Sequence, residues 1–104
     1  MSTLQAQATV ATDKASRYLQ ALCGHFNRKV TATWDEHKGE VDFGFGHCQM
    51  QADASNLVID IQSDTEENFA RVKYVVGDHL ERFAVKDGLT ATWQSATSPQ
   101  GAES

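Results

Sequence analysis

The sequence predicts an α+β domain, a two-layer sandwich in which an antiparallel sheet of about five strands carries two helices on one face. Two segments repeat apolar residues at three- and four-residue steps, as amphipathic helices do. Five shorter segments alternate apolar and polar residues, as half-buried strands do. Short turns join four of these strands, which favours an antiparallel meander. The expected order is therefore helix, four strands, helix, strand.

The first helix is expected over about residues 13–23, with Thr12 as its N-cap. Gly24 is the expected stop, because glycine adopts the left-handed conformation of a helix C′ residue without strain. Cys23 then faces the core from the last turn, and His25 lies just beyond the helix.

The four central strands are read from their period of two, with turns at 35–39, near Gly46 and at 53–56. Their inward residues are Val30, Ala32, Trp34, Val41, Phe43, Phe45, Cys48, Met50, Ala52, Leu57, Ile59 and Ile61. The residues 89–93 ("LTATW") are expected to form the last strand.

The second helix follows a capping-box pattern, with Ser63 expected at the N-cap and Glu66 at N3. An apolar stripe runs from Phe69 to Phe83 at helical spacing, and the residues 86–88 end it.

The length of 104 residues and a 40% hydrophobic composition suit a single core. We assign the domain to residues 9–93. Residues 1–8 and 94–104 are polar and non-periodic, which is typical of disordered tails.

The charge balance bears on the class of partner. Nine basic residues stand against fourteen acidic ones, for a net charge of −5, so the chain lacks the basic footprint of nucleic-acid binding. No apolar run approaches the roughly 20 residues that cross a bilayer, and the first residues do not resemble a secretory signal. We expect a cytoplasmic protein with reduced thiols; the oligomeric state stays open.

Four reactive side chains are predicted to meet where the sheet faces the helix ends: Cys23, His25, Cys48 and His79. Two thiolates and two imidazoles suit a tetrahedral metal such as zinc, and sulfur also suits iron. Their spacing is not that of a known zinc motif. The alternative is that the cysteines are small core residues and the histidines are satisfied by neighbouring polar groups.

Other candidate sites carry less signal. Arg28, Lys29 and Arg82 predict an anion or partner contact near His25, with a solvated surface as the alternative. His37 and His47 are expected at the surface. No catalytic set is assigned, since no serine has an identifiable base partner.

Three stretches, "LCGHFNRKV", "GEVDFGFGHCQMQAD" and "HLERFAVKDGLTATW", carry a family resemblance. Over about Tyr18 to Trp93 the chain resembles the bacterial domain of unknown function numbered twenty-two eighteen. The shared elements here are Cys23, His25, Phe26, Cys48, His79, Leu80, Arg82 and Phe83. Some members of that family sit beside, or are fused to, siderophore-interacting reductases, so the resemblance implies a role in bacterial iron acquisition. It implies no activity.

Three hypotheses about function follow. The first is an accessory protein that binds a metal or a siderophore in bacterial iron handling. The second is a metal-free interaction module that docks on a siderophore-reductase-type partner. A small enzyme with a reactive thiol is the third and is less favoured than either binding role.

Overall fold

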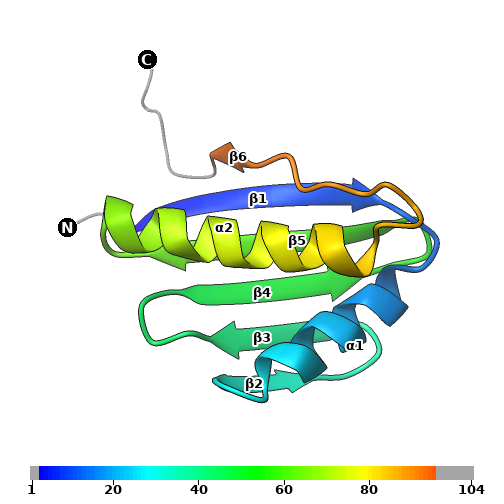
Figure 1. Ribbon diagram of the computed structural model, residues 1–104, viewed down its shortest axis with the longest axis horizontal. Coiled ribbons are helices and arrows are strands. Elements are labelled where there is room, and N and C mark those ends of the chain that lie inside the picture. Colours follow the sequence, from blue (N-terminus) through cyan, green and yellow to red (C-terminus); the bar gives the residue numbers. More distant parts are fainter. Residues whose placement is uncertain (1–2, 96–104) are drawn as a thin grey trace.

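A six-stranded antiparallel sheet forms one layer of the molecule, and two helices form the other (Figure 1). The structure is a computed structural model that describes residues 3–95. Its elements are β1 (Leu4–Ala11), α1 (Ala15–Phe26), β2 (Thr31–Trp34), β3 (Lys38–Asp42), β4 (His47–Ala52), β5 (Asn56–Ser63), α2 (Glu66–Phe83) and β6 (Gln94–Ser95). The strand order in the sheet is β2-β3-β4-β5-β1-β6.

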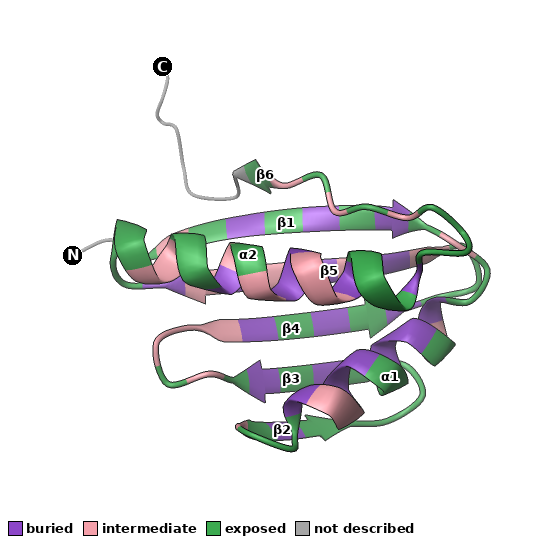
Figure 2. Ribbon diagram, in the orientation of Figure 1, coloured by how far each residue is buried: buried purple, intermediate pink, exposed green. Residues whose placement is uncertain are grey.

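The core lies between the sheet and the helices. Both helices lie in front of the same sheet face, α2 over β5 and α1 over β2 and β3 (Figure 1). Burial alternates along β4 and β5, so every second side chain points at the helices (Figure 2). The expected inward residues of these strands are buried: Cys48, Met50, Ala52, Leu57, Ile59 and Ile61. The α+β class and the single helical layer are thus confirmed.

The prediction of a disordered tail is wrong for residues 4–8, which belong to β1, while residues 1 and 2 lie outside the described residues. The register of β1 with β5 runs from Leu4 opposite Ser63 to Ala11 opposite Asn56. Ala6 and Ala8 are buried, and their small side chains give only a weak hydrophobic signal. β1 also puts a strand before the first helix, so the observed order is strand, helix, four strands, helix, strand.

The first helix also differs from its prediction at both ends. It continues through Gly24 to Phe26, with Lys14 as its N-cap and Asn27 as its C-cap. Gly24 is not among the glycines with positive φ, so it is an ordinary helical residue. The buried side chain of Phe26 packs into the core, and the extra turn that places it there also brings His25 into the helix.

Thr65, and not Ser63, caps α2. The Thr65 hydroxyl accepts a hydrogen bond from the backbone N–H of Asn68 at 3.1 Å. Ser63 is the last residue of β5, and its hydroxyl donates to the carbonyl oxygen of Phe45 at 2.7 Å. β5 therefore remains paired in the sheet as far as Ser63, the residue that the capping pattern had assigned to the start of the helix.

The segment after α2 runs back along β1. Residues 89–93 do not form the expected strand, but Leu89, Ala91 and Trp93 are partly buried against the core, in the predicted phase. Asp87 fixes the start of this segment, because it accepts a hydrogen bond from the Tyr18 hydroxyl and forms an ion pair with Lys14.

The chain reaches the sheet again at β6. Gln94 and Ser95, expected in a C-terminal tail, pair with β1. The remainder of that tail, 96–104, lies outside the described residues. Within residues 3–95, neither helix has the length and apolar character needed to cross a membrane.

Candidate ligand pocket

The two cysteines lie in the core. Cys23 comes from α1 and Cys48 from β4, and both are 0% exposed. Burial raises the pKa of the Cys23 thiol to about 11. Burial also raises the pKa of Cys48, and the nearby Cys23 raises it further. Both residues are therefore protonated thiols at neutral pH and act as small apolar groups.

The two histidines instead lie side by side at the surface. His25 comes from the last turn of α1 and His79 from α2, and their ring centroids are 4.8 Å apart. Nδ1 of His79 lies 2.7 Å from the carbonyl oxygen of Val75. A neutral ring must donate at Nδ1 to make this bond, so the Nε2 lone pair is left to accept a proton or a ligand.

Desolvation lowers the pKa of His25, and the positive charges of His79, Arg28 and Lys29 lower it further. His25 is therefore predominantly neutral at pH 7. An anion placed between these groups would reverse the charge effects, because it favours the protonated imidazole.

The histidine pair opens onto a pocket of about 520 Å³, within the range of roughly 300–1,000 Å³ that small-molecule sites occupy. Residues of α1, the segment after it, the β3–β4 turn and α2 line it: His25, Phe26, Arg28, Lys29, Val30, Phe43, Val75 and His79.

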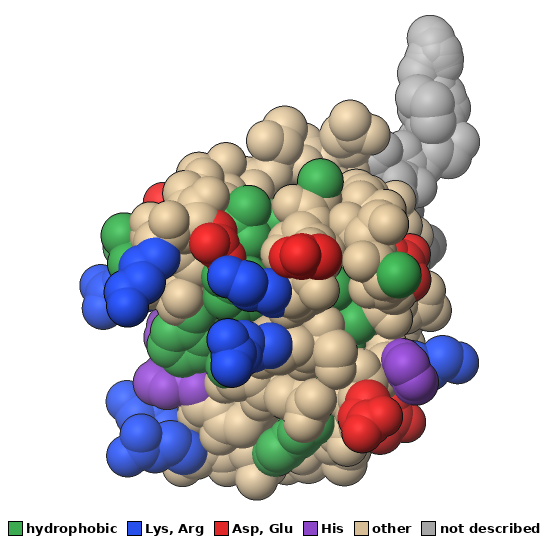
Figure 3. Space-filling model, turned by 90° about the vertical axis from the view of Figure 1, so that its right-hand side faces the viewer, with side chains coloured by type: hydrophobic (Ala, Val, Ile, Leu, Met, Phe, Trp, Pro, Cys, Tyr) green, Lys and Arg blue, Asp and Glu red, His purple; other side chains and the backbone are tan. Residues whose placement is uncertain are grey.

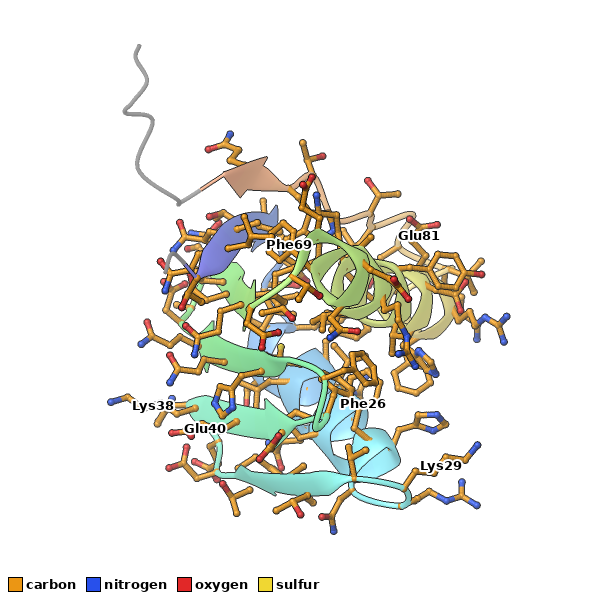
Figure 4. All side chains as sticks on the ribbon, turned by 90° about the vertical axis from the view of Figure 1, so that its left-hand side faces the viewer. Phe26, Lys29, Lys38, Glu40, Phe69 and Glu81 are labelled. Carbon is orange, nitrogen blue, oxygen red and sulfur yellow. The ribbon has the colours of Figure 1, made fainter. Side chains whose placement is uncertain are left out.

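Aromatic rings form much of the pocket wall. The Phe26 ring lies edge-on to Phe43 at 5.2 Å and to His79 at 5.0 Å between centroids. Phe83 contacts His25 in the same manner at 5.5 Å. Figure 4 shows Phe26 between the helices and the β3–β4 turn. These edge-on contacts fix the ring positions and give the pocket a rigid apolar floor.

The rim of the pocket is basic. Within the described residues, Arg28 and Lys29 take part in no ion pair, and Lys29 points outward from the end of α1 (Figure 4). Figure 3 shows Lys and Arg side chains above and below a pair of histidines on the helical side. Arg82, predicted to join this patch, is paired with Asp78 at 3.0 Å and does not line the pocket.

The four predicted metal ligands thus lie in two different places. Across residues 3–95, no three His, Cys, Asp or Glu side chains form a group that could hold a metal ion. The two thiols and the two imidazoles therefore do not form the predicted tetrahedral Cys₂His₂ site, and these residues as placed do not fit a zinc or iron ion with four ligands. Of the four residues, His25 and His79 do lie next to each other, and Arg28 and Lys29, predicted to lie near His25, line the same pocket.

The remaining histidines face other directions. His37 is exposed in the β2–β3 turn, and His47 lies on the outer face of the sheet, 3.5 Å from Glu40. Sequence reasoning missed Phe43 and Val75 as pocket residues. Val75 lies four residues before His79, a spacing that places both on one helix face. The position of Val75 beside the pocket could therefore have been predicted from the sequence.

Fold and pocket together define a small two-layer α+β domain with a ligand-sized cavity between its helices. The family model described as an uncharacterized protein conserved in bacteria, DUF2218, matches residues 7–94. The chain belongs to this family, as the sequence resemblance predicted. The link to siderophore-interacting reductases stays a prediction.

A solved structure supports the fold. The NMR structure of PA4090 from Pseudomonas aeruginosa is 32% identical, covers 91% of this chain and 99% of its own, and superposes with a TM-score of 0.76. No curated protein matches the chain.

Proposed function

We propose that this chain is a small cytoplasmic accessory protein that binds an anionic, partly aromatic ligand in the pocket beside His25 and His79. The resemblance to proteins encoded beside siderophore reductases makes an iron-chelating siderophore, or its ferric complex, the candidate ligand. Such molecules combine aromatic or other planar groups with negatively charged oxygens.

One observation carries the proposal. Arg28 and Lys29 have no carboxylate partner among the described residues, although acidic residues outnumber basic ones in the chain. They stand beside two imidazoles and an aromatic floor. Cations beside a desolvated apolar surface favour an anion with a flat apolar part, because each portion of the ligand finds its complement.

The proposal is tested by titrating the labelled protein with dihydroxybenzoate, a catechol carboxylate, and with its ferric complex, while recording amide NMR spectra. We expect shifts concentrated at His25, Phe43 and His79. The double substitution Arg28→Gln/Lys29→Gln should weaken binding at least tenfold.

The matched control is Lys38→Gln, a basic residue on β3 that is exposed and remote from the pocket. It should leave binding unchanged. Shifts spread over the whole surface, or equal losses in the control and the double variant, would contradict the proposal.

A second candidate is the metal-free interaction module. Tyr74 on α2 is 71% exposed and Val85, just after α2, is 72% exposed, and a protein contact at this surface would remove both side chains from water. A pull-down with a siderophore-interacting reductase tests it. Tyr74→Ser should abolish capture if this surface is the contact, and capture unaffected by that substitution would count against it.

A further inference from the structure

The aromatic wall of the pocket continues beyond the pocket itself. Phe43 lines the pocket and stacks on Phe45 with ring centroids 5.7 Å apart and planes inclined by 28°. The guanidinium carbon of Arg71 lies 4.1 Å from the centroid of the Phe45 ring. A continuous row of rings therefore leads from the histidine pair to a third cation.

The spacing along α2 places Arg71 on the pocket side of the helix. Arg71, Val75 and His79 follow one another at four-residue steps, so each lies next to the following one along the helix surface. Val75 and His79 line the pocket. At 1.5 Å per residue, Arg71 lies about 12 Å along the helix from His79.

The turn that carries Phe45, beneath Arg71, is held in place by two contacts. The carbonyl oxygen of Phe45 accepts the hydrogen bond of the buried Ser63 hydroxyl. Gly46 packs so closely on Val72 that an added Cβ would clash with it. The β3–β4 turn is thus fixed against α2, and the Phe45 ring is a fixed platform for the guanidinium.

Arg71 has no carboxylate partner among residues 3–95. Glu67 lies one turn earlier on α2 but forms no ion pair with it. Arg82, one turn after Asp78, is paired in the usual manner. A stacked guanidinium keeps its in-plane N–H donors directed outward, where they can bind a carboxylate in bidentate geometry.

We propose that the site takes an elongated dianion. One acidic group would lie at the histidine pair with Arg28 and Lys29, the planar part along the edges of the Phe43 and Phe45 rings, and a second acidic group roughly 12 Å away at Arg71. This inference rests on the proposed function and adds the length and the charge pattern of the ligand.

Two rod-shaped probes test it. Stilbene dicarboxylate has a carboxylate at each end, at a comparable separation, and stilbene monocarboxylate has only one. We expect the wild-type protein to bind the dicarboxylate about tenfold more tightly, as one extra charge-assisted hydrogen-bonded contact provides. Arg71→Gln should remove this difference and leave the affinity for the monocarboxylate unchanged.

Lys73→Gln is the matched control, because Lys73 also lies over a phenylalanine ring, that of Phe69, at 4.9 Å. It should keep the preference for the dicarboxylate. Equal affinities for the two probes in the wild-type protein, or a preference that survives Arg71→Gln, would overturn the elongated dianion while the proposed pocket stands. If neither probe shifts the amides of His25 and His79, the elongated dianion fails, whereas the proposed pocket fails only if dihydroxybenzoate does not shift them either.

Discussion

Gly39 of β3 lies directly beneath Cys23 of α1, so closely that a Cβ added at Gly39 would be 2.5 Å from Cys23 Sγ. The same added atom would lie 3.3 Å from Cδ2 of Leu19. The absence of a side chain at Gly39 thus sets how closely α1 approaches the sheet, and with it the position of His25 at the helix end.

Gly39→Ala is therefore expected to destabilise the fold by about 1–3 kcal/mol, the usual cost of overpacking a core. Urea denaturation followed by circular dichroism measures it. Adding Cys23→Ala should recover part of the loss, because it removes the clashing sulfur. A Gly39→Ala protein as stable as the wild type would show that the helix can shift freely.

Gly24→Ala should have the opposite effect. Gly24 lies inside α1 without a positive φ, and an added Cβ would be 3.7 Å from Cζ2 of Trp34, an ordinary contact. Alanine should then stabilise the protein by roughly 0.5–1 kcal/mol. The same denaturation experiment checks it, and destabilisation would indicate a left-handed helix end at Gly24.

The position of Gly24 inside α1 illustrates how much of the fold could be predicted from the sequence alone. Helical periodicity located both helices, but the end of α1 depends on Phe26 reaching the core, a tertiary contact that glycine rules do not contain. β1 was missed because alanine supplies much of its buried face, and alanine contributes little to either hydrophobicity or strand propensity. Strands with larger buried residues, such as β5, were found in the correct phase.

Binding of an anion to the pocket should depend on pH through His25. The desolvated environment and the positive charges of His79, Arg28 and Lys29 lower its pKa from 6.5. An anion favours the protonated ring, so affinity should rise as the pH falls through the pKa of His25 in the complex, by up to about tenfold per pH unit, and level off below its lowered pKa in the free protein. NMR titrations with dihydroxybenzoate across about pH 5–8 measure this.

His79→Gln gives a second readout at the same site. Without the His79 charge, the pKa of His25 should move up toward its ordinary value while desolvation still holds it below. His47→Gln is the control and should not change it. A His25 titration that is the same in both variants would contradict electrostatic coupling between the two rings.

The thiols should be unreactive in the native protein. Both are fully buried, and at a pKa of about 11 for Cys23 only about one thiol in ten thousand is ionised at pH 7. A thiol-specific reagent should label Cys23 and Cys48 slowly when the protein is folded and rapidly in denaturant. Rapid labelling of the folded protein would favour a catalytic thiolate.

Elemental analysis of the purified protein tests the Cys₂His₂ prediction directly. Since Cys48 lies in the core, apart from the histidine pair, we expect Cys48→Ala to leave the zinc or iron content unchanged. Near-stoichiometric metal that disappears in this variant, with the fold intact by circular dichroism, would restore the four-ligand site.

The contact between Tyr18 and Asp87 should make stability depend on acidity. The Tyr18 hydroxyl lowers the pKa of Asp87 from 3.8, and Lys14 lowers it further. A carboxyl with a depressed folded-state pKa stabilises the fold above its unfolded value and loses this contribution as pH falls through the folded value. Tyr18→Phe should therefore lower the melting temperature at pH 7, with a smaller difference at strongly acidic pH. An equal difference at both pH values would contradict this role.

The candidate site was predictable only in part. The sequence placed Arg28 and Lys29 near His25, because they are close in the chain. Bringing His79 to the same place required the packing of α2 against α1. The alternation of apolar and polar residues correctly predicted that Cys48 points inward. It did not show whether an inward side chain reaches the core or the histidine pair, because that depends on how the helices pack on the sheet.

The place of β1 in the strand order has a consequence for how the protein is made. Among the described elements β1 is synthesised first, yet its main partner, β5, is complete only at Ser63. α1 and the meander from β2 to β5 have mostly local contacts and can assemble during synthesis. β1, in contrast, can pair with β5 only after β2, β3, β4 and β5 have been synthesised. Pairing across such a separation is a slow step, so changes in β1 should affect the final docking of the sheet more than its nucleation.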